Sequence, residues 1–314
     1  MHILKSNLNI DFNQYRVSAT IFSAVLLIAS AISIGVNGLA LGLDFTGGTL
    51  IEVRFEEDAS RDQIQAQLEK AGFDKTVVQY FGTSKDITIR LAPQAGKKNA
   101  EIGDAVLKAI REDSDTNVVM RRIEFVGPAV GDELAEQGGL AMLVALIFIM
   151  LYVSVRFEWK FAVGSVAALA HDVLITMGLF SIIQMEFNLT VLAAILAVIG
   201  YSLNDTIVVF DRIRENFLKL RKSDPEKVVN SSLNQTLSRT LMTSITTLLV
   251  LVALFFLGGE LIHGFATALI AGVFVGTYSS IYVASNVALA LGITKEDLMP
   301  IEVEKEGEDQ DALM

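Results

Sequence analysis

Six apolar runs, each long enough to cross a bilayer, constrain this chain more than any other feature of its sequence. An α-helix needs about 20 apolar residues to span about 30 Å of hydrocarbon. Hydrophobic residues make up 52% of the 314 residues, which is typical of a polytopic membrane protein. The first run is far longer than the apolar core of a secretory signal, so we interpret it as a retained anchor. The runs cover residues 17–39, 136–155, 161–183, 189–210, 237–257 and 264–290.

The distribution of Lys and Arg between these runs predicts the orientation of the chain. Cytoplasmic connections of membrane proteins are enriched in both residue types. The connections at 184–188 and 258–263 contain neither of them. We therefore expect both termini in the cytoplasm and the large insert at 40–135 on the outer side of the membrane. The basic positions that define this pattern are Lys5, Arg16, Arg156, Lys160, Arg212, Arg214, Lys219, Arg221, Lys222 and Lys227.

The predicted organisation follows from this orientation. A cytoplasmic N-terminus (1–16) precedes the first membrane helix (17–39), and an α+β domain on the outer side (40–135) precedes five further membrane helices (136–290). A basic cytoplasmic connection is expected at about 211–236, and an acidic cytoplasmic tail at 291–314. The basic residues do not gather on one folded face, so nucleic acid is not an expected partner. The chain has no cysteine, which excludes disulfides and thiolate chemistry.

The insert at 40–135 has the pattern of a folded domain rather than a linker. Ile51, Val53 and Phe55 alternate with charged residues, which predicts a half-buried strand. A helix is expected after Ser60, then strands near 75–81 and 86–92, a helix near 98–113 and a strand near 117–126. This βαββαβ order predicts a ferredoxin-like domain. Its strand edges either dock extended chains or pair within the domain or with a partner subunit.

Two opposite charges lie inside consecutive apolar runs. Asp205 is the only charged residue between Leu189 and Phe210, and Arg239 is the only one in the next run. At about 1.5 Å per residue, each lies ~8 Å from the cytoplasmic end of its helix, so antiparallel helices would place them at the same depth. A charge on a membrane helix is costly and usually faces a protein interior or a water-filled cavity. We interpret the pair as part of a proton path; the alternative is a static ion pair that fixes helix register.

Other polar side chains accompany this pair. An adjacent histidine and aspartate lie near the middle of the third run, where they either relay protons, pair with a neighbouring helix or line a vestibule. Two such residues are too few for a metal site, so no metal is expected. Threonine hydroxyls on the fifth run either hold water or bond back to their own backbone. The candidate relay or lining residues are Asp172, His171, Ser202, Asn204 and Thr243.

Glycines mark two further features. Gly47 and Gly48 follow the first run, and Gly127 and Pro128 precede the second. Each pair is either a hinge or a rigid elbow between the insert and the membrane. In the sixth run small residues recur every four positions, which lets helix backbones approach closely against a sibling helix or another subunit. The packing positions are Gly264, Gly272, Gly276 and Ser280.

Four segments of the chain resemble a known family. Together with six spans and one large insert, they are similar to SecF subunits of the bacterial Sec protein-export machinery, within the RND-type transporter superfamily. The resemblance extends over nearly the whole chain. The segments are LGLDFTGGTLIEVRF (41–55), VGPAVGDEL (126–134), VIGYSLNDTIVVFDRIREN (198–216) and LNQTLSRTLMTS (233–244).

The resemblance implies a six-helix half of a larger unit whose other half is SecD, with YajC as a further small partner. It implies an inner-membrane protein that uses the proton-motive force in late steps of preprotein translocation through the SecYEG channel, alongside the SecA ATPase. The family's proton-site acid falls on Asp205 and its arginine on Arg239, and a further acid comes from SecD. The coupling ion is H⁺, and no cofactor is expected.

Other functions remain as alternatives. A half-transporter for a small solute or lipid needs a ligand-sized pocket, for which the small insert offers little room. A passive scaffold of the translocon would keep its function when Asp205 is neutralised. An enzyme is least favoured, because the sequence shows no nucleophile–base set and no metal constellation.

Overall fold

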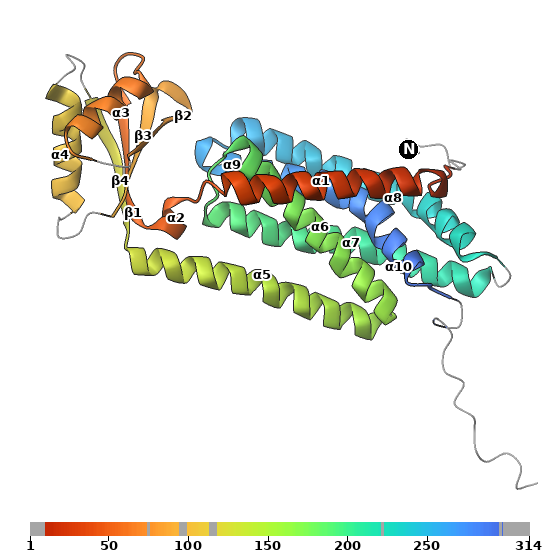
Figure 1. Ribbon diagram of the computed structural model, residues 1–314. Helices are drawn as coiled ribbons and strands as arrows, with labels where there is room; N and C mark the ends of the chain where they lie inside the picture. The colour runs from red at the N-terminus through yellow and green to blue at the C-terminus, as the bar shows by residue number, and fades with distance from the viewer. Residues whose placement is uncertain are drawn as a thin grey trace, which may run out of the picture.

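The computed structural model describes residues 10–73, 76–93, 99–112, 118–220, 223–294 and 297. It consists of a bundle of long helices and a small α+β domain at one end of that bundle (Figure 1). Several predicted features lie outside the described residues. These are the first nine residues of the expected cytoplasmic N-terminus, most of the acidic tail, and the basic residues Lys5, Arg221 and Lys222.

Six helices of the described residues are long and apolar enough to cross a membrane, as the apolar runs predict. The short helix η1 (Asn13–Tyr15) leads into the first of them. The sixth span is composite, since a π-helical turn, η2 (Ser280–Ala284), separates α9 (Glu260–Ser279) from α10 (Ser285–Ala290). The other five spans are α1 (Arg16–Asn37), α5 (Pro128–Arg156), α6 (Trp159–Ile183), α7 (Leu189–Lys219) and α8 (Pro225–Leu257).

Helices α6 and α7 form the centre of the bundle. Helices α1, α5 and α9 pack against α6, while α8 and α9 pack against α7. The fully buried rings of Phe161 and Phe210 join the two central helices, with centroids 4.5 Å apart. The outer faces of α1, α5 and α8 expose rows of large apolar side chains. Apolar surfaces of this extent are typical of regions that contact lipid or another subunit.

The connections that carry most of the basic residues lie at the end of the bundle far from the α+β domain (Figure 1). The expected connection at 211–236 is largely helical, because α7 continues to Lys219 and α8 begins at Pro225. The segment before α1 lies against the start of α8. There the backbone N–H groups of Ile10 and Phe12 each donate a hydrogen bond of 2.8 Å to an asparagine side chain of α8.

The α+β domain has the predicted βαββαβ order. Its sheet has the strand order β2-β3-β1-β4, and all neighbouring strands are antiparallel. The structure begins β3 earlier than the sequence predicts, because the polar residues at 83–86 extend the strand without an apolar alternation. The elements are β1 (Gly48–Phe55), α3 (Arg61–Lys70), β2 (Val77–Phe81), β3 (Thr83–Leu91), α4 (Asn99–Glu112) and β4 (Val118–Val126).

One face of this sheet is covered by α3 and α4. The predicted inward residues of β1 are buried, and they pack with Ile64 of α3 and Val106 of α4 in one apolar core. The opposite face is polar: Glu52 of β1 lies 3.7 Å from Arg122 of β4. Burial on one face therefore fixes the register of β1, since a slip of one residue would exchange the two faces.

Several contacts attach the domain to the loop between α6 and α7. The backbone N–H of Gly42 donates to the carbonyl of Phe187 over 2.7 Å, and Asp44 Oδ2 accepts from the N–H of Leu189 over 2.9 Å. Asp44 belongs to α2 (Leu43–Thr46), a single helical turn that follows α1. Arg90 of β3 forms an ion pair of 2.6 Å with Glu186. The domain is thus held on the bundle by backbone and side-chain bonds together.

Candidate functional site

Asp205 lies on the inner face of α7. Its side chain is buried, with only 4% of the residue exposed. Oxygen Oδ2 has no hydrogen-bond partner among the described residues. The hydroxyls of Thr206 and Tyr201 on the same helix, and of Thr240 on α8, are also buried without a partner. A buried carboxylate needs a partner to remain charged, so this cluster is suited to exchanging a proton or to holding water.

Arg239 on α8 is the positive charge that acts on the Asp205 carboxylate. Within the described residues, however, no ion pair of 4.0 Å or less joins the two side chains. Arg239 is exposed at the surface of the bundle, whereas Asp205 faces its interior. The structure therefore brings the two predicted residues near one another without a direct contact. This arrangement differs from the static ion pair considered for them.

Asp172 on α6 has hydrogen-bond partners at both of its carboxylate oxygens. It is fully buried, and its Oδ2 accepts hydrogen bonds from Ser202 of α7 at 2.6 Å and from Ser279 of α9 at 2.7 Å. Its Oδ1 lies 3.0 Å from Nδ1 of His171. Ser202 is three residues from Asp205, about 4.5 Å along the helix axis. The two buried acids are therefore separated by about one turn of α7.

The other predicted lining residues take different positions. Asn204 is exposed on the surface of α7, next to the buried Asp205. Thr243 donates to the carbonyl of Thr240 over 2.8 Å, and Thr236 donates to the carbonyl of Ser232 over 3.0 Å. Two hydroxyls of the threonine face thus bond back to their own helix. The buried Thr240 hydroxyl makes no such bond among the described residues.

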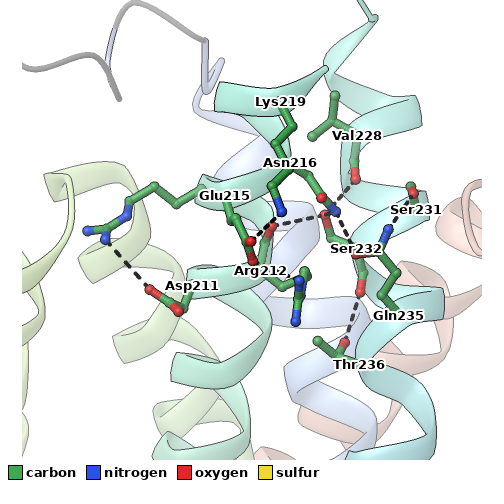
Figure 2. Close-up of polar contacts among 11 residues, drawn as sticks. Asp211, Arg212, Glu215, Asn216, Lys219, Val228, Ser231, Ser232, Gln235 and Thr236 are labelled. Carbon is green, nitrogen blue, oxygen red and sulfur yellow. Dashed lines mark hydrogen bonds and ion pairs between the residues drawn. The ribbon is translucent and has the colours of Figure 1, made fainter. Parts of the chain in front are cut away.

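Side-chain hydrogen bonds clamp α7 to α8 at the basic end of the bundle (Figure 2). The buried Asn216 of α7 donates to Ser232 Oγ at 2.8 Å and to Gln235 Oε1 at 3.1 Å. Ser232 Oγ in turn donates to the carbonyl of Val228 over 2.7 Å. Because this clamp lies about one turn from Arg239, it fixes the level at which α8 passes Asp205. Asn216 was not predicted from the sequence, although it is a polar residue on the inner face of the same motif.

The small residues of α9 form the contact with α7. A Cβ atom at Gly272 would lie 2.1 Å from a methyl group of Val198, and one at Gly276 would lie 3.0 Å from Cβ of Ser202. A Cβ at Gly264 would lie 3.1 Å from a methyl of Val191. Ser280 is buried in the π-helical turn and bonds to the carbonyl of Thr277 at 3.0 Å. The close approach at Gly276 is what allows Ser279 and Ser202 to reach the same carboxylate.

The two glycine pairs at the boundary of the domain lie against one another. Gly47 has a positive φ of 63°, and a Cβ there would lie 2.9 Å from Cα of Pro128. Gly48 has a φ of 124°, and a Cβ there would lie 2.3 Å from the carbonyl oxygen of Leu91. Gly127, the residue before α5, has open space around it. Gly47 and Pro128 thus pack against each other, and Gly48 packs against Leu91; we call this junction between the domain and the bundle the elbow.

Two side chains of the bundle centre were not predicted from the sequence. Tyr278 of α9 stacks on His171, with ring centroids 6.2 Å apart, and its hydroxyl donates to the carbonyl of Ala19 on α1 at 2.7 Å. Ser279 bonds Asp172 directly. The available signal was a run of four polar residues, Thr277 to Ser280, inside an otherwise apolar span. Within the described residues, no group of three or more His, Asp or Glu side chains is arranged to hold a metal.

Comparisons with known proteins show which family this chain is similar to. Residues 106–294 match the family model of the protein export membrane protein SecD/SecF, C-terminal, and residues 32–59 match the SecD/SecF GG motif. The chain is 55% identical to a protein translocase subunit SecF of Vibrio alginolyticus, over 99% of both chains. It is 48% identical to the corresponding subunit of Escherichia coli O157:H7, over 97% of this chain and 94% of that one.

A solved structure also resembles this chain. The crystal structure of SecDF from Thermus thermophilus, described as a translocon-associated membrane protein, matches with a TM-score of 0.83 and 38% identity. The match covers 92% of this chain but only 39% of that one. This chain therefore spans about two fifths of the length of the SecDF polypeptide.

Proposed function

This chain belongs to the SecD/SecF family of protein export membrane proteins, and we propose that it couples proton movement through the bundle to the late steps of preprotein translocation across the inner membrane. One observation carries the proposal. A buried carboxylate, Asp205, has a free oxygen inside a membrane helix while its nearest counter-charge, Arg239, lies at the surface. A charged acid inside a membrane protein is costly, and acids at such positions usually mark an ion or proton path.

The proposed cycle begins with Asp205 ionised. Its negative charge attracts Arg239, which draws α8 toward α7. When a proton binds to the carboxylate this attraction disappears, and the two helices are free to move apart. Release of the proton on the other side restores the attraction. The movement of one unit charge through 100 mV supplies ~2.3 kcal/mol, which is more than the ~1.4 kcal/mol that changes an equilibrium tenfold.

The surface of α7 indicates where a partner half would pack. Ala193, Ala197, Gly200 and Asn204 are exposed along one face of this helix. Small residues at such spacing allow another helix to approach closely, and an exposed asparagine at membrane depth is costly unless a partner covers it. We assign this face, with Arg239 beside it, to the SecD half of the complex. A further acid from that half would complete the proton site.

The proposed orientation places the α+β domain in the periplasm. The connections that carry Arg156, Lys160, Arg212 and Lys219 lie at the opposite end of the bundle, and such residues favour the cytoplasm. The strand order and the βαββαβ succession support a ferredoxin-like assignment for this domain. In this orientation the domain meets a preprotein that emerges from the SecYEG channel. SecA would act on the other side of the membrane, and YajC would be a further membrane partner.

A transporter for a small solute is less well supported. The cavity between the polar face of the outer sheet and the membrane bundle has a volume of about 240 Å³ and is lined by charged residues such as Glu52, Arg122 and Glu186. Sites for drug-sized ligands usually measure ~300–1,000 Å³ and are mostly apolar. The cavity is therefore smaller than the sites that usually hold a ligand of that class.

The test uses the complex with SecD, reconstituted in vesicles together with the channel. Export completion is measured with and without a proton gradient for the wild type, Asp205→Asn and Arg239→Met. Arg212→Met is the matched control, because Arg212 also lies on this helix pair but bonds to Glu215 at the surface. We expect both site variants to lose the response to the gradient while the control keeps it. A full response in Asp205→Asn would refute the proposal and favour a passive scaffold.

A further inference from the structure

We propose that His171 and Asp172 form a second proton-binding site, separate from Asp205, and that loading this site loosens the attachment of α6 to α7 and α9. The inference rests on the proposed function only for the source of the proton, the proton-motive force. The site itself is argued from the hydrogen bonds of the bundle centre.

The position of Asp172 is unusual for a carboxylate. The residue is fully buried, and the three groups that bond it come from three different helices. Both serine hydroxyls donate to Oδ2, so this oxygen carries no proton in the structure. Oδ1 lies 3.0 Å from Nδ1 of His171, and in the proposed resting state a neutral His171 donates the hydrogen on Nδ1 to it. The carboxylate thus connects α6, α7 and α9 through hydrogen bonds. We call this cluster the knot; its members are His171, Asp172, Ser202 and Ser279.

The second nitrogen of His171 provides the entry for a proton. The ring is buried, with 3% exposed, and Nε2 has no hydrogen-bond partner among the described residues. A proton that binds to Nε2 makes the ring an imidazolium. The ring then passes the proton on Nδ1 to Oδ1 of Asp172, and it becomes neutral again with its hydrogen on Nε2. One proton is taken up in total, and the charge of the pair changes from −1 to zero.

This uptake weakens the knot without breaking a covalent bond. Hydrogen bonds to an ionised acceptor are about twice as strong as bonds between neutral groups. After loading, Ser202 and Ser279 donate to a neutral acid, so α7 and α9 are held less firmly against α6. Ser279 is the last residue before the π-helical turn η2. Such turns are frequent at functional sites and offer a place where the helix can change its winding.

The surroundings of the pair contain few other titratable groups. Among the described residues, Tyr278 of α9 stacks on His171, and Asp205 follows about one turn along α7. Tyr278 is held by α1 through Ser23 and the carbonyl of Ala19. The remaining contacts of Asp172 are serine hydroxyls. A proton released from Asp172 therefore has Asp205, beyond Ser202, as the next acid along α7.

The direct test is infrared difference spectroscopy of the purified complex with SecD, between alkaline and acid pH. We expect a band of a protonated carboxylic acid that disappears in Asp172→Asn and persists in Asp205→Asn. The asparagine amide has nearly the shape of the carboxylate and retains an oxygen for both serines, so folding should be preserved. A band that is unchanged in Asp172→Asn would overturn the proposal, because Asp172 would then never carry a proton.

A second measurement tests the mechanical part. Ser279→Ala removes one bond of the knot, whereas Ser280→Ala removes a buried serine that bonds only within its own helix. We expect the first variant to shift the pH at which the carboxylic band appears and the second to leave it in place. Equal behaviour of the two variants would contradict a role for the knot. If the wild type itself showed no gradient-dependent export, the proposed function would be refuted. The infrared measurement would still decide whether Asp172 binds a proton.

Discussion

At the scale of single residues, the two buried acids of the bundle differ in their hydrogen-bond partners. Asp172 is held by hydroxyls and a histidine, whereas Asp205 is buried with a free oxygen. A structural ion pair would be expected to satisfy its carboxylate. The free oxygen of Asp205 is therefore the feature that favours a proton site over a static contact.

This difference predicts the effect of Asp205→Asn on stability. Removing one member of a buried ion pair usually costs ~3–5 kcal/mol, because the other charge is left unpaired. Here Arg239 is exposed and, within the described part of the chain, makes no ion pair with Asp205, so we expect Asp205→Asn to leave the thermal unfolding midpoint of the complex unchanged or slightly raised. Circular dichroism of the purified complex measures this. A decrease of the size expected for a broken ion pair would identify Asp205 as a structural residue.

The glycines of the elbow give a second residue-level prediction. Gly48→Ala should destabilise the attachment of the α+β domain, since φ at this position suits only glycine and the new Cβ would meet the carbonyl of Leu91. Strain of this kind costs ~1–3 kcal/mol. Gly127→Ala is the control, because nothing lies within 4 Å of its Cβ position. Limited proteolysis of the complex should cleave the first variant faster; equal cleavage would show that the elbow tolerates the change.

At the scale of elements, the glycine face of α9 sets its distance from α7. Gly272→Ala would place a methyl group against the stiff side chain of Val198. Overpacking of this type costs ~1–3 kcal/mol. We expect a lower unfolding midpoint for Gly272→Ala and partial recovery when Val198→Ala is added. Additive effects in this double-mutant cycle would mean that the two residues do not determine the contact.

The elements themselves were largely predictable, and the reason is physical. Apolar runs of membrane length and the alternation at Ile51, Val53 and Phe55 report burial directly. The bounds of β3 were missed because its first residues are polar and exposed.

Helix rise correctly predicted that Asp205 and Arg239 lie equally far from their helix ends, but the predicted ~8 Å was wrong. Each is 14 residues, about 21 Å, from the end of its helix at Lys219 or Pro225, because both helices continue beyond the apolar runs. Their separation was not predictable, because sequence spacing does not show which way each side chain faces.

The knot around Asp172 shows the same limit. His171 and Asp172 were recognisable as costly residues in a span, but their partners come from helices far away in the sequence. Ser202 was singled out for its neighbour Asp205, and Ser279 was not singled out at all. Contacts that depend on the packing of three helices cannot be predicted from the hydrophobic periodicity of any single helix.

At the scale of the whole molecule, the ion pair of Arg90 with Glu186 connects the outer sheet to the loop between the central helices. Arg90 also donates to the carbonyl of Leu41 over 2.8 Å. Movement of α6 and α7 would therefore be transmitted to the α+β domain through this point. The same contact would limit how far the domain tilts at rest.

This predicts that Arg90→Ala broadens the range of positions of the domain. The chain has no cysteine, so spin labels can be placed at Asp62→Cys on α3 and Leu261→Cys at the outer end of α9 without a background. Electron paramagnetic resonance should give a wider distance distribution for Arg90→Ala than for the wild type. Arg54→Ala is the control, since Arg54 pairs with Asp86 inside the domain. Equally narrow distributions in all three proteins would show that the elbow alone fixes the domain.

The central claim, that a proton passes through Asp205, is tested most directly by proton entry into vesicles that contain the complex and a trapped pH-sensitive dye. We predict rapid acidification for the wild type and for Asp86→Asn, a control in the outer sheet, and acidification at the rate of empty vesicles for Asp205→Asn. Entry through Asp205→Asn at the wild-type rate would contradict the account.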